Sequence, residues 1–236
     1  MVVWIASYPR SGNTMVRMLL RYGFGLSTYS VFDDPLLERE DSASTIGHLP
    51  LPDDLDRLAR RNELYLVKTH RLDDSASPHP AIYIVRDGRD ALVSCAHYQL
   101  RYGPPRLARA LLERCPQSVR DAVFRRTLSR MVRDARFGGW SRNVAAWHAR
   151  RGPTVTVRYE DIVRAPLQAL RTACDEIGVV PGGPSRDLPS FQSLSERWPG
   201  MFRRGVAGAW REEMPDDIHE QFWQRHGDGM RLVGYA

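Results

Sequence analysis

The first twenty residues place the strongest constraint on the fold of this 236-residue chain. Residues 2–6 form an apolar run rich in β-branched side chains, and residues 7–14 form a polar turn after it. Apolar residues then recur at helical spacing from Met15 to Leu20. A buried strand that passes through a turn into a helix is typical of α/β domains. Because unpaired N–H groups and the positive end of the helix dipole meet at such a turn, it should bind an anion.

The side chains of this turn indicate that the anion is a phosphate. Arg10, two hydroxyl groups and a conformationally permissive Gly12 would surround it. The turn lacks the GxxxxGK[ST] pattern of nucleotide triphosphatases, and the chain has no Gly-Lys pair. The sequence therefore predicts a phosphate site of a different type.

The composition fits one α/β domain with an anionic ligand. With 42% hydrophobic residues, the chain can bury one substantial core, so we expect a single domain over residues 1–236. Its 34 basic and 28 acidic side chains give a net charge of +6, which favours an anionic partner. The sequence shows no zinc-finger spacing, RNP motif or basic helical repeat, so we do not expect nucleic acid to be that partner.

The start of the chain and its cysteines bear on its expected location. No basic leader precedes the first strand, and no run of about 18 or more uncharged apolar residues occurs later, so we predict a cytoplasmic protein without membrane insertion. Cys95, Cys115 and Cys174 are odd in number and lack metal-ligand spacing. Neither a disulfide framework nor a zinc site is expected from them.

A second polar cluster follows the apolar run of residues 64–67. Lys68, Thr69 and His70 stand where this predicted strand ends, and Lys68 is the only lysine in the chain. Ligands gather at the carboxyl ends of parallel strands, so the cluster should lie beside the turn of residues 7–14. Taken alone, these residues could equally be an ordinary surface lysine and a loop histidine.

A third polar segment follows the predicted strand of residues 81–86. This strand ends at Arg86, and a helix can begin at Asp87 or Gly88. Ser94 lies on that helix, eight residues after Arg86. Further along, residues 98–139 are arginine-rich and predict acceptor-binding or lid helices.

Taken together, five segments resemble the PAPS-dependent sulfotransferase family, PAPS being 3′-phosphoadenosine 5′-phosphosulfate. The segments are Tyr8-Pro9-Arg10-Ser11-Gly12-Asn13-Thr14-Met15, Lys68-Thr69-His70, Arg86 to Ser94, Arg158-Tyr159-Glu160-Asp161 and Phe202 to Trp210. They follow one another in the family's order. The resemblance implies a three-layer, P-loop-like α/β domain with a mainly parallel central sheet flanked by helices, and the alternation of predicted strands and helices supports it.

The resemblance also implies how the donor would be held. Arg10, Ser11, Gly12, Asn13, Thr14 and Met15 would grip the 5′-phosphosulfate, Arg86, Ser94, Arg203, Arg204 and Gly205 would hold the 3′-phosphate, and Tyr159 and Phe191 would lie by the adenine. Three positions depart from the family pattern. Arg10 and Arg204 replace lysines, and Met15 replaces a tryptophan that packs on adenine.

The implied reaction moves a sulfuryl group from PAPS to an acceptor hydroxyl and releases adenosine 3′,5′-bisphosphate (PAP). His70 would take the acceptor proton as general base, and Lys68 and Arg10 would stabilise the developing charge. Because fixed cations would replace the magnesium of kinases, no metal is expected. The acceptor is predicted to be a small molecule, natural product or carbohydrate. Sulfotransferases differ in their loops, and residues 23–62 and 99–139 do not identify the acceptor. The sequence leaves the oligomeric state open.

Two other function classes share part of this pattern. A P-loop kinase or nucleotide hydrolase has the same expected fold, but it needs a Walker lysine and magnesium ligands that the sequence does not show. A non-catalytic binder of nucleotides or nucleic acid would explain the charge and the phosphate turn. It would leave Lys68, Thr69 and His70 without a function.

Overall fold

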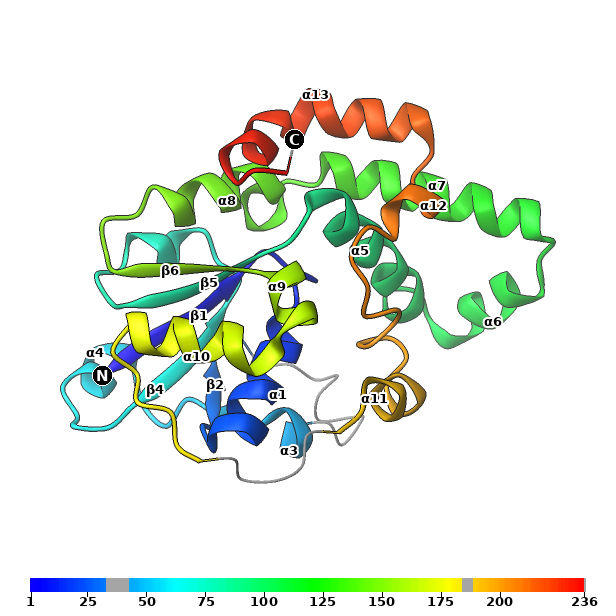
Figure 1. The fold of residues 1–236 in the computed structure, drawn as a ribbon. Helices are drawn as coiled ribbons and strands as arrows, with labels where there is room; N and C mark the ends of the chain where they lie inside the picture. Colours follow the sequence, from blue (N-terminus) through cyan, green and yellow to red (C-terminus); the bar gives the residue numbers. More distant parts are fainter. Residues whose placement is uncertain (33–42, 184–188, 236) are drawn as a thin grey trace.

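The computed structural model describes residues 1–32, 43–183 and 189–235 (Figure 1). At its centre is a six-stranded sheet in the order β3-β2-β4-β1-β5-β6, and neighbouring strands pair in parallel throughout. The strands are β1 (Val2–Ser7), β2 (Thr28–Ser30), β3 (His48–Pro50), β4 (Tyr65–Thr69), β5 (Ala81–Val85) and β6 (Thr154–Arg158). The predicted parallel sheet is confirmed, and the three strands with polar ends lie side by side at its centre.

Helices cover both faces of the sheet, as Figure 1 shows. The helices of the described residues are α1 (Asn13–Phe24), α3 (Ala43–Ile46), α4 (Leu55–Ala59), α5 (Gly88–Tyr102), α6 (Arg106–Arg114), α7 (Gln117–Arg133), α8 (Gly139–His148), α9 (Tyr159–Arg164), α10 (Pro166–Glu176), α11 (Phe191–Arg197), α12 (Trp210–Glu213) and α13 (Asp216–Leu232). Of two 3₁₀ turns, η1 (Asp73–Ala76) lies between β4 and β5, and η2 (Arg136–Gly138) lies between α7 and α8.

The structure shows why the first five positions of strand β1, residues 2–6, are all apolar. Val3 and Ile5 pack into the core beneath α1 and α10, whereas Val2 and Trp4 pack into the core beneath α8 and α13. Side chains alternate between the two faces of a strand, and a strand covered on both faces must be apolar on both. The three-layer arrangement is therefore confirmed.

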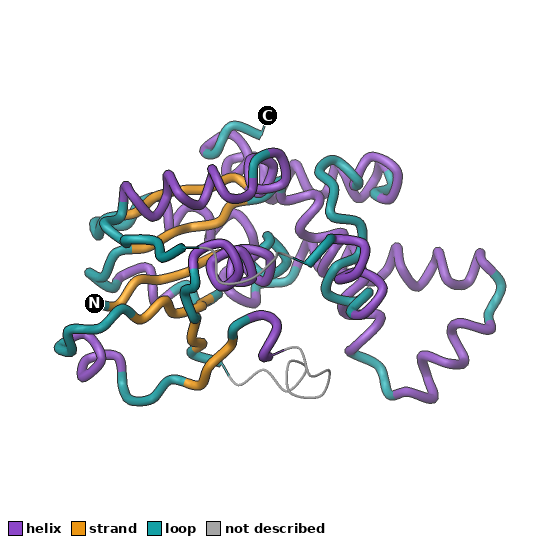
Figure 2. Tube along the Cα trace, turned by 60° about the horizontal axis from the view of Figure 1, so that its bottom comes forward, coloured by secondary structure: helices purple, strands orange, loops and turns teal. Residues whose placement is uncertain are grey.

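The arginine-rich segment of residues 98–139, predicted to be helical, contains the end of α5, all of α6 and α7, and η2. Helix α5 continues to Tyr102, and α7 is 17 residues long because its second half buries Leu128, Met131 and Val132 against the body of the protein. Helix α6 has no buried residue, and Figure 2 shows the α6–α7 hairpin extending away from the sheet.

Several smaller expectations can also be compared with the structure. The tryptophans of α8, Trp140 and Trp147, are fully buried in the core. All three cysteines carry free thiols. Within the described residues, no helix is both long enough and apolar enough to cross a membrane. Residues 33–42, part of the segment 23–62 whose ligand the sequence does not identify, lie outside the described residues.

Candidate active site

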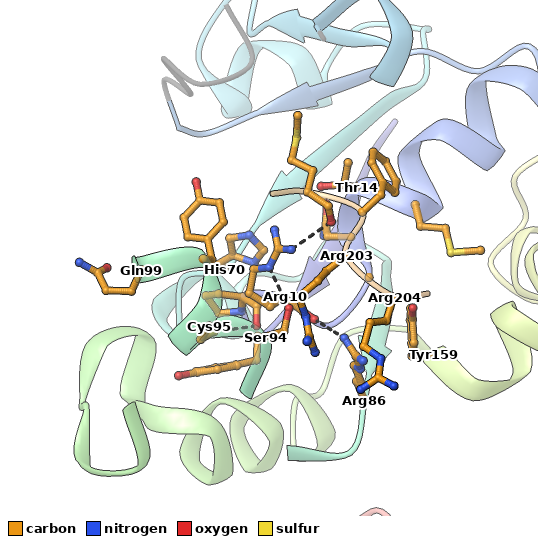
Figure 3. Close-up of a pocket in the computed structure, with 18 of the residues that line it drawn as sticks. Arg10, Thr14, His70, Arg86, Ser94, Cys95, Gln99, Tyr159, Arg203 and Arg204 are labelled. Carbon is orange, nitrogen blue, oxygen red and sulfur yellow. Dashed lines mark hydrogen bonds between the residues drawn. The ribbon is translucent and has the colours of Figure 1, made fainter. Parts of the chain in front are cut away.

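A cavity of about 350 Å³ lies where β1, β4 and β5 end, at the carboxyl edge of the sheet (Figure 3). Its lining includes every residue predicted to form the site except Ser11: Arg10, Gly12, Asn13, Thr14, Met15, Lys68, His70, Arg86, Ser94, Tyr159, Phe191, Arg203, Arg204 and Gly205. Parallel strands bring their polar ends to one edge, which is why segments separated by more than a hundred residues meet here.

The turn after β1 packs closely against Tyr159, which also lines the cavity. Helix α1 begins at Asn13, directly after Gly12, which has a φ of 104°. A Cβ atom at this glycine would lie 2.6 Å from the ring of Tyr159. Only glycine satisfies both the backbone conformation and this close approach, so the turn and the predicted adenine-side tyrosine are in direct contact.

The polar groups of the turn are only partly satisfied within the protein. The Asn13 amide donates to the Ile5 carbonyl at 2.9 Å and to Ser7 Oγ at 3.3 Å, which fixes the turn to β1. Ser11 Oγ, Asn13 Oδ1 and Arg86 Nε are buried without a hydrogen-bond partner in the described part of the chain. Buried polar groups are normally paired, and the first amides of a helix have no intrahelical acceptor. The turn therefore fits a bound phosphate group.

Arg10 does not point at the catalytic histidine predicted beside it. Its Nε donates to Ser94 Oγ at 3.2 Å, and its Nη2 donates to the carbonyls of Gly200 and Met201 at 3.1 and 3.0 Å. The guanidinium carbon also lies 4.9 Å from the centre of the Tyr98 ring. Arg10 thus connects the turn after β1 to α5 and to the segment before Arg203.

Arg86 follows the end of β5 and connects two loops by hydrogen bonds. It donates to the Arg10 carbonyl and to the Val206 carbonyl, both at 3.2 Å, and its guanidinium lies 4.3 Å from the centre of the Tyr159 ring (Figure 3). Asp90, one turn into α5, accepts the amide hydrogens of Gly208 at 2.6 Å and Trp210 at 2.9 Å. These bonds fix the last predicted segment over the cavity.

Arg203, Arg204 and Gly205 form that last segment. Gly205 has a φ of 64°, and a Cβ atom there would lie 2.4 Å from the Phe191 ring. The ring of Phe191, the second side chain predicted to lie by the adenine, is therefore packed on the backbone of the segment predicted to bind the 3′-phosphate. The two arginine side chains form ion pairs with acidic residues of α12.

His70 is held in one orientation at the end of β4. Its Nδ1 lies 2.8 Å from the Ser7 carbonyl, so Nδ1 carries a proton that it donates, and in the neutral ring Nε2 is left with the free electron pair. Burial, and then the positive charge of Lys68, lower the pKa of His70 from 6.5 to about 3. The ring is therefore neutral and able to accept a proton at physiological pH.

The residues that surround His70 could not be predicted from the sequence. Phe32 stacks on its ring and Phe137 packs edge-on, each at a centroid distance of 5.9 Å. Asn143 of α8 donates to the carbonyls of His70 and Phe137 at 3.2 and 3.3 Å, and Tyr83 donates to Asn143 Oδ1 at 3.1 Å. No motif marks these positions, because each belongs to a different element.

We expect the His70 ring of the donor-free protein to stay neutral as the pH falls from 8 to about 5, since its pKa is about 3. Nuclear magnetic resonance of the ring nitrogens measures this directly, with the His70→Gln variant identifying the signal. The unfolded chain takes up this proton below about pH 6.5 and the folded chain does not, so His70 lowers stability as the pH falls from 6.5 towards 3. A titration midpoint between about pH 6 and 7 would contradict the buried, neutral state.

Comparison with known proteins decides the family. The model of the sulfotransferase domain family matches residues 2–234, nearly the whole chain. The chain belongs to the sulfotransferase family. The resemblance and the enzyme class predicted from the five segments are thereby confirmed.

This sulfotransferase is also similar to a known enzyme and to two solved structures. Flavonol 3-sulfotransferase of Flaveria bidentis is 27% identical over 266 residues, covering 93% of this chain and 78% of that enzyme. The mouse sulfotransferase SULT7A1, solved with PAP, has a TM-score of 0.63 and 18% identity over 100% of this chain and 89% of its own. Retinol dehydratase, solved with androsterone and PAP, has a TM-score of 0.57 and 17% identity over 98% and 80%. These structures confirm the P-loop-like fold.

Proposed function

We propose that this sulfotransferase transfers the sulfuryl group of PAPS to a hydroxyl of a small-molecule or carbohydrate acceptor, with His70 as general base. The observation that carries the proposal is the arrangement of His70 at the cavity. Its Nδ1 is bonded to the Ser7 carbonyl, which leaves Nε2 as the base, and Lys68 and Arg10 line the same cavity. Structures of similar fold were solved with PAP, which supports PAPS as the donor.

The cavity and the turn beside it carry groups that match the two ends of such a donor. The first amides of α1 and the Ser11 hydroxyl would bind the 5′-phosphosulfate, and Arg86, Ser94 and Arg203 would bind the 3′-phosphate. Tyr159 and Phe191, each packed on a glycine of a phosphate segment, would flank the adenine. Bound PAPS supplies a sulfuryl group on a phosphate leaving group.

The residues of the chain then provide proton transfer and charge stabilisation. His70 Nε2 takes the proton of the acceptor hydroxyl as its oxygen attacks sulfur. Lys68 and Arg10 stabilise the negative charge that grows on the leaving phosphate, so the proposed reaction needs no metal ion. Ser94 Oγ accepts from Arg10 Nε, so its own O–H remains available to donate to the 3′-phosphate.

The surroundings of His70 favour an acceptor with an apolar or aromatic body. Phe32 and Phe137 flank the imidazole, so a hydroxyl that reaches Nε2 brings its neighbouring carbons against these two rings. The named substrates of similar proteins, a flavonol and retinol, are molecules of this kind. This likeness supports a small-molecule acceptor over a carbohydrate.

Calorimetry with PAP, ATP and a short RNA separates this function from the two alternatives. We expect PAP to bind at least about tenfold more tightly than ATP, because only PAP carries a 3′-phosphate for Arg86 and Ser94. Release of PAP from PAPS in the presence of phenolic and alcoholic acceptors then tests turnover. Tighter binding of ATP with magnesium would favour a kinase, and tighter binding of RNA would favour a non-catalytic binder.

A further inference from the structure

The carboxylate of Glu213, on α12 outside the predicted site, contacts three cationic or ionisable side chains. Arg203 Nη1 donates to both of its oxygens, at 2.8 and 2.9 Å, and Arg204 Nη1 lies 3.3 Å from Oε1. His97 Nε2 lies 2.5 Å from Oε2. The Glu213 side chain is only 16% exposed, so water screens these contacts little.

Glu213 binds one end of the Arg203 guanidinium and leaves the other end available. Only Nη1 of Arg203 is bonded, while Nε and Nη2 have no protein partner in the part of the chain that the structure describes. Arg203 lines the same cavity as Arg86 and Ser94. Since a guanidinium is planar, fixing one nitrogen on a carboxylate fixes the directions in which the others donate.

The third partner connects Glu213 to the helix that carries Ser94. His97 lies three residues after Ser94 on α5, so both are on one side of that helix. Burial raises the pKa of Glu213, but hydrogen bonds from His97 and Arg203 and their charges outweigh burial and lower the pKa to about 2. The carboxylate therefore stays ionised at neutral pH and holds Arg203 at a fixed place relative to Ser94.

We propose that Glu213 is a positioning residue of the donor site: it orients Arg203 toward the 3′-phosphate and so favours donors that carry this group. The inference rests on the proposed function, because it requires PAPS as donor. Preorganisation of this kind strengthens binding by removing the need to immobilise a long side chain when the ligand arrives.

The carboxylate of Glu213 also repels a nearby phosphate. Repulsion weakens the binding of the 3′-phosphate, whereas the orientation of Arg203 strengthens it. If repulsion dominated, Glu213 would weaken the binding of the 3′-phosphate, and its removal would strengthen it. The contacts of Arg203 Nη1 with both oxygens of Glu213, and the two unused nitrogens of Arg203, favour orientation as the larger effect. The sign of the change in affinity therefore decides between them.

The test compares PAP with adenosine 5′-monophosphate, which lacks the 3′-phosphate, by calorimetry on the full chain. For Glu213→Gln we expect the Kd of PAP to rise about tenfold and the Kd of the monophosphate to change less than about twofold. The matched control is Glu212→Gln. Glu212 pairs with Arg204 alone and is 69% exposed, so both Kd values should stay within about twofold of the wild type.

Each outcome has a definite meaning for the inference. A selective loss of PAP affinity in Glu213→Gln alone supports the positioning role. Unchanged or tighter PAP binding overturns it, and so does an equal loss for both ligands, which is the signature of general damage to the fold. If the wild type itself does not prefer PAP to the monophosphate, the proposed donor is wrong, and the failure lies with the function rather than with Glu213.

Discussion

Replacing His70 with alanine should lower turnover by about a hundredfold to ten-thousandfold, the usual cost of losing a general base. PAP should still bind within about twofold of the wild type, since the proposed donor contacts come from other segments. The ring that provides Nε2 is oriented by the Ser7 carbonyl and kept neutral by burial and by Lys68. Alanine has no group that can take the acceptor proton in its place. Turnover at saturating PAPS and acceptor measures the effect.

The exposed histidine at the end of α8 provides the matched control for this experiment. His148 does not line the cavity, and His148→Ala should turn over at the wild-type rate. Calorimetry with PAP shows whether His70→Ala still has an intact donor site. Turnover of His70→Ala within a few-fold of the wild type would show that His70 is not the base.

Adenosine 5′-phosphosulfate, which lacks the 3′-phosphate, should bind about a hundredfold to ten-thousandfold more weakly than PAPS. The 3′-phosphate is expected to contact Arg86, Ser94 and Arg203, which line one cavity. Two hydrogen bonds to a charged group contribute about 1.5–3 kcal/mol each, or about 3–6 kcal/mol together. Dissociation constants of the two donors, measured without acceptor, give the ratio directly.

Ser94→Ala tests which group provides this discrimination. The variant removes one hydroxyl and leaves the backbone of α5 unchanged, so the preference for PAPS should fall about tenfold. Binding of adenosine 5′-phosphosulfate itself should not change, because that donor has no group for Ser94 to bind. Equal dissociation constants of the wild type for the two donors would exclude the proposed 3′-phosphate site.

The parts of the site that the sequence predicted are those encoded within a few residues. The turn between residues 7 and 14 follows from an apolar strand, a glycine and the start of a helix. Lys68, His70 and Arg86 were predicted at strand ends, and parallel pairing of β4, β1 and β5 brings them together. The predicted start of α5 at Asp87 or Gly88 is confirmed, since Asp87 caps the helix. Local spacing and parallel topology placed these residues at one edge of the sheet, and the resemblance to the sulfotransferase family assigned them to the site.

The partners of each side chain were decided only by the tertiary structure. Arg10 reaches the Gly200 carbonyl 190 residues away, His70 is oriented by Ser7, and Arg203 is shared between the cavity and Glu213. Backbone conformation depends on neighbours in sequence, and a motif can record it. A hydrogen bond between distant side chains depends on how helices pack on both faces of the sheet, and no short segment of the chain contains that information.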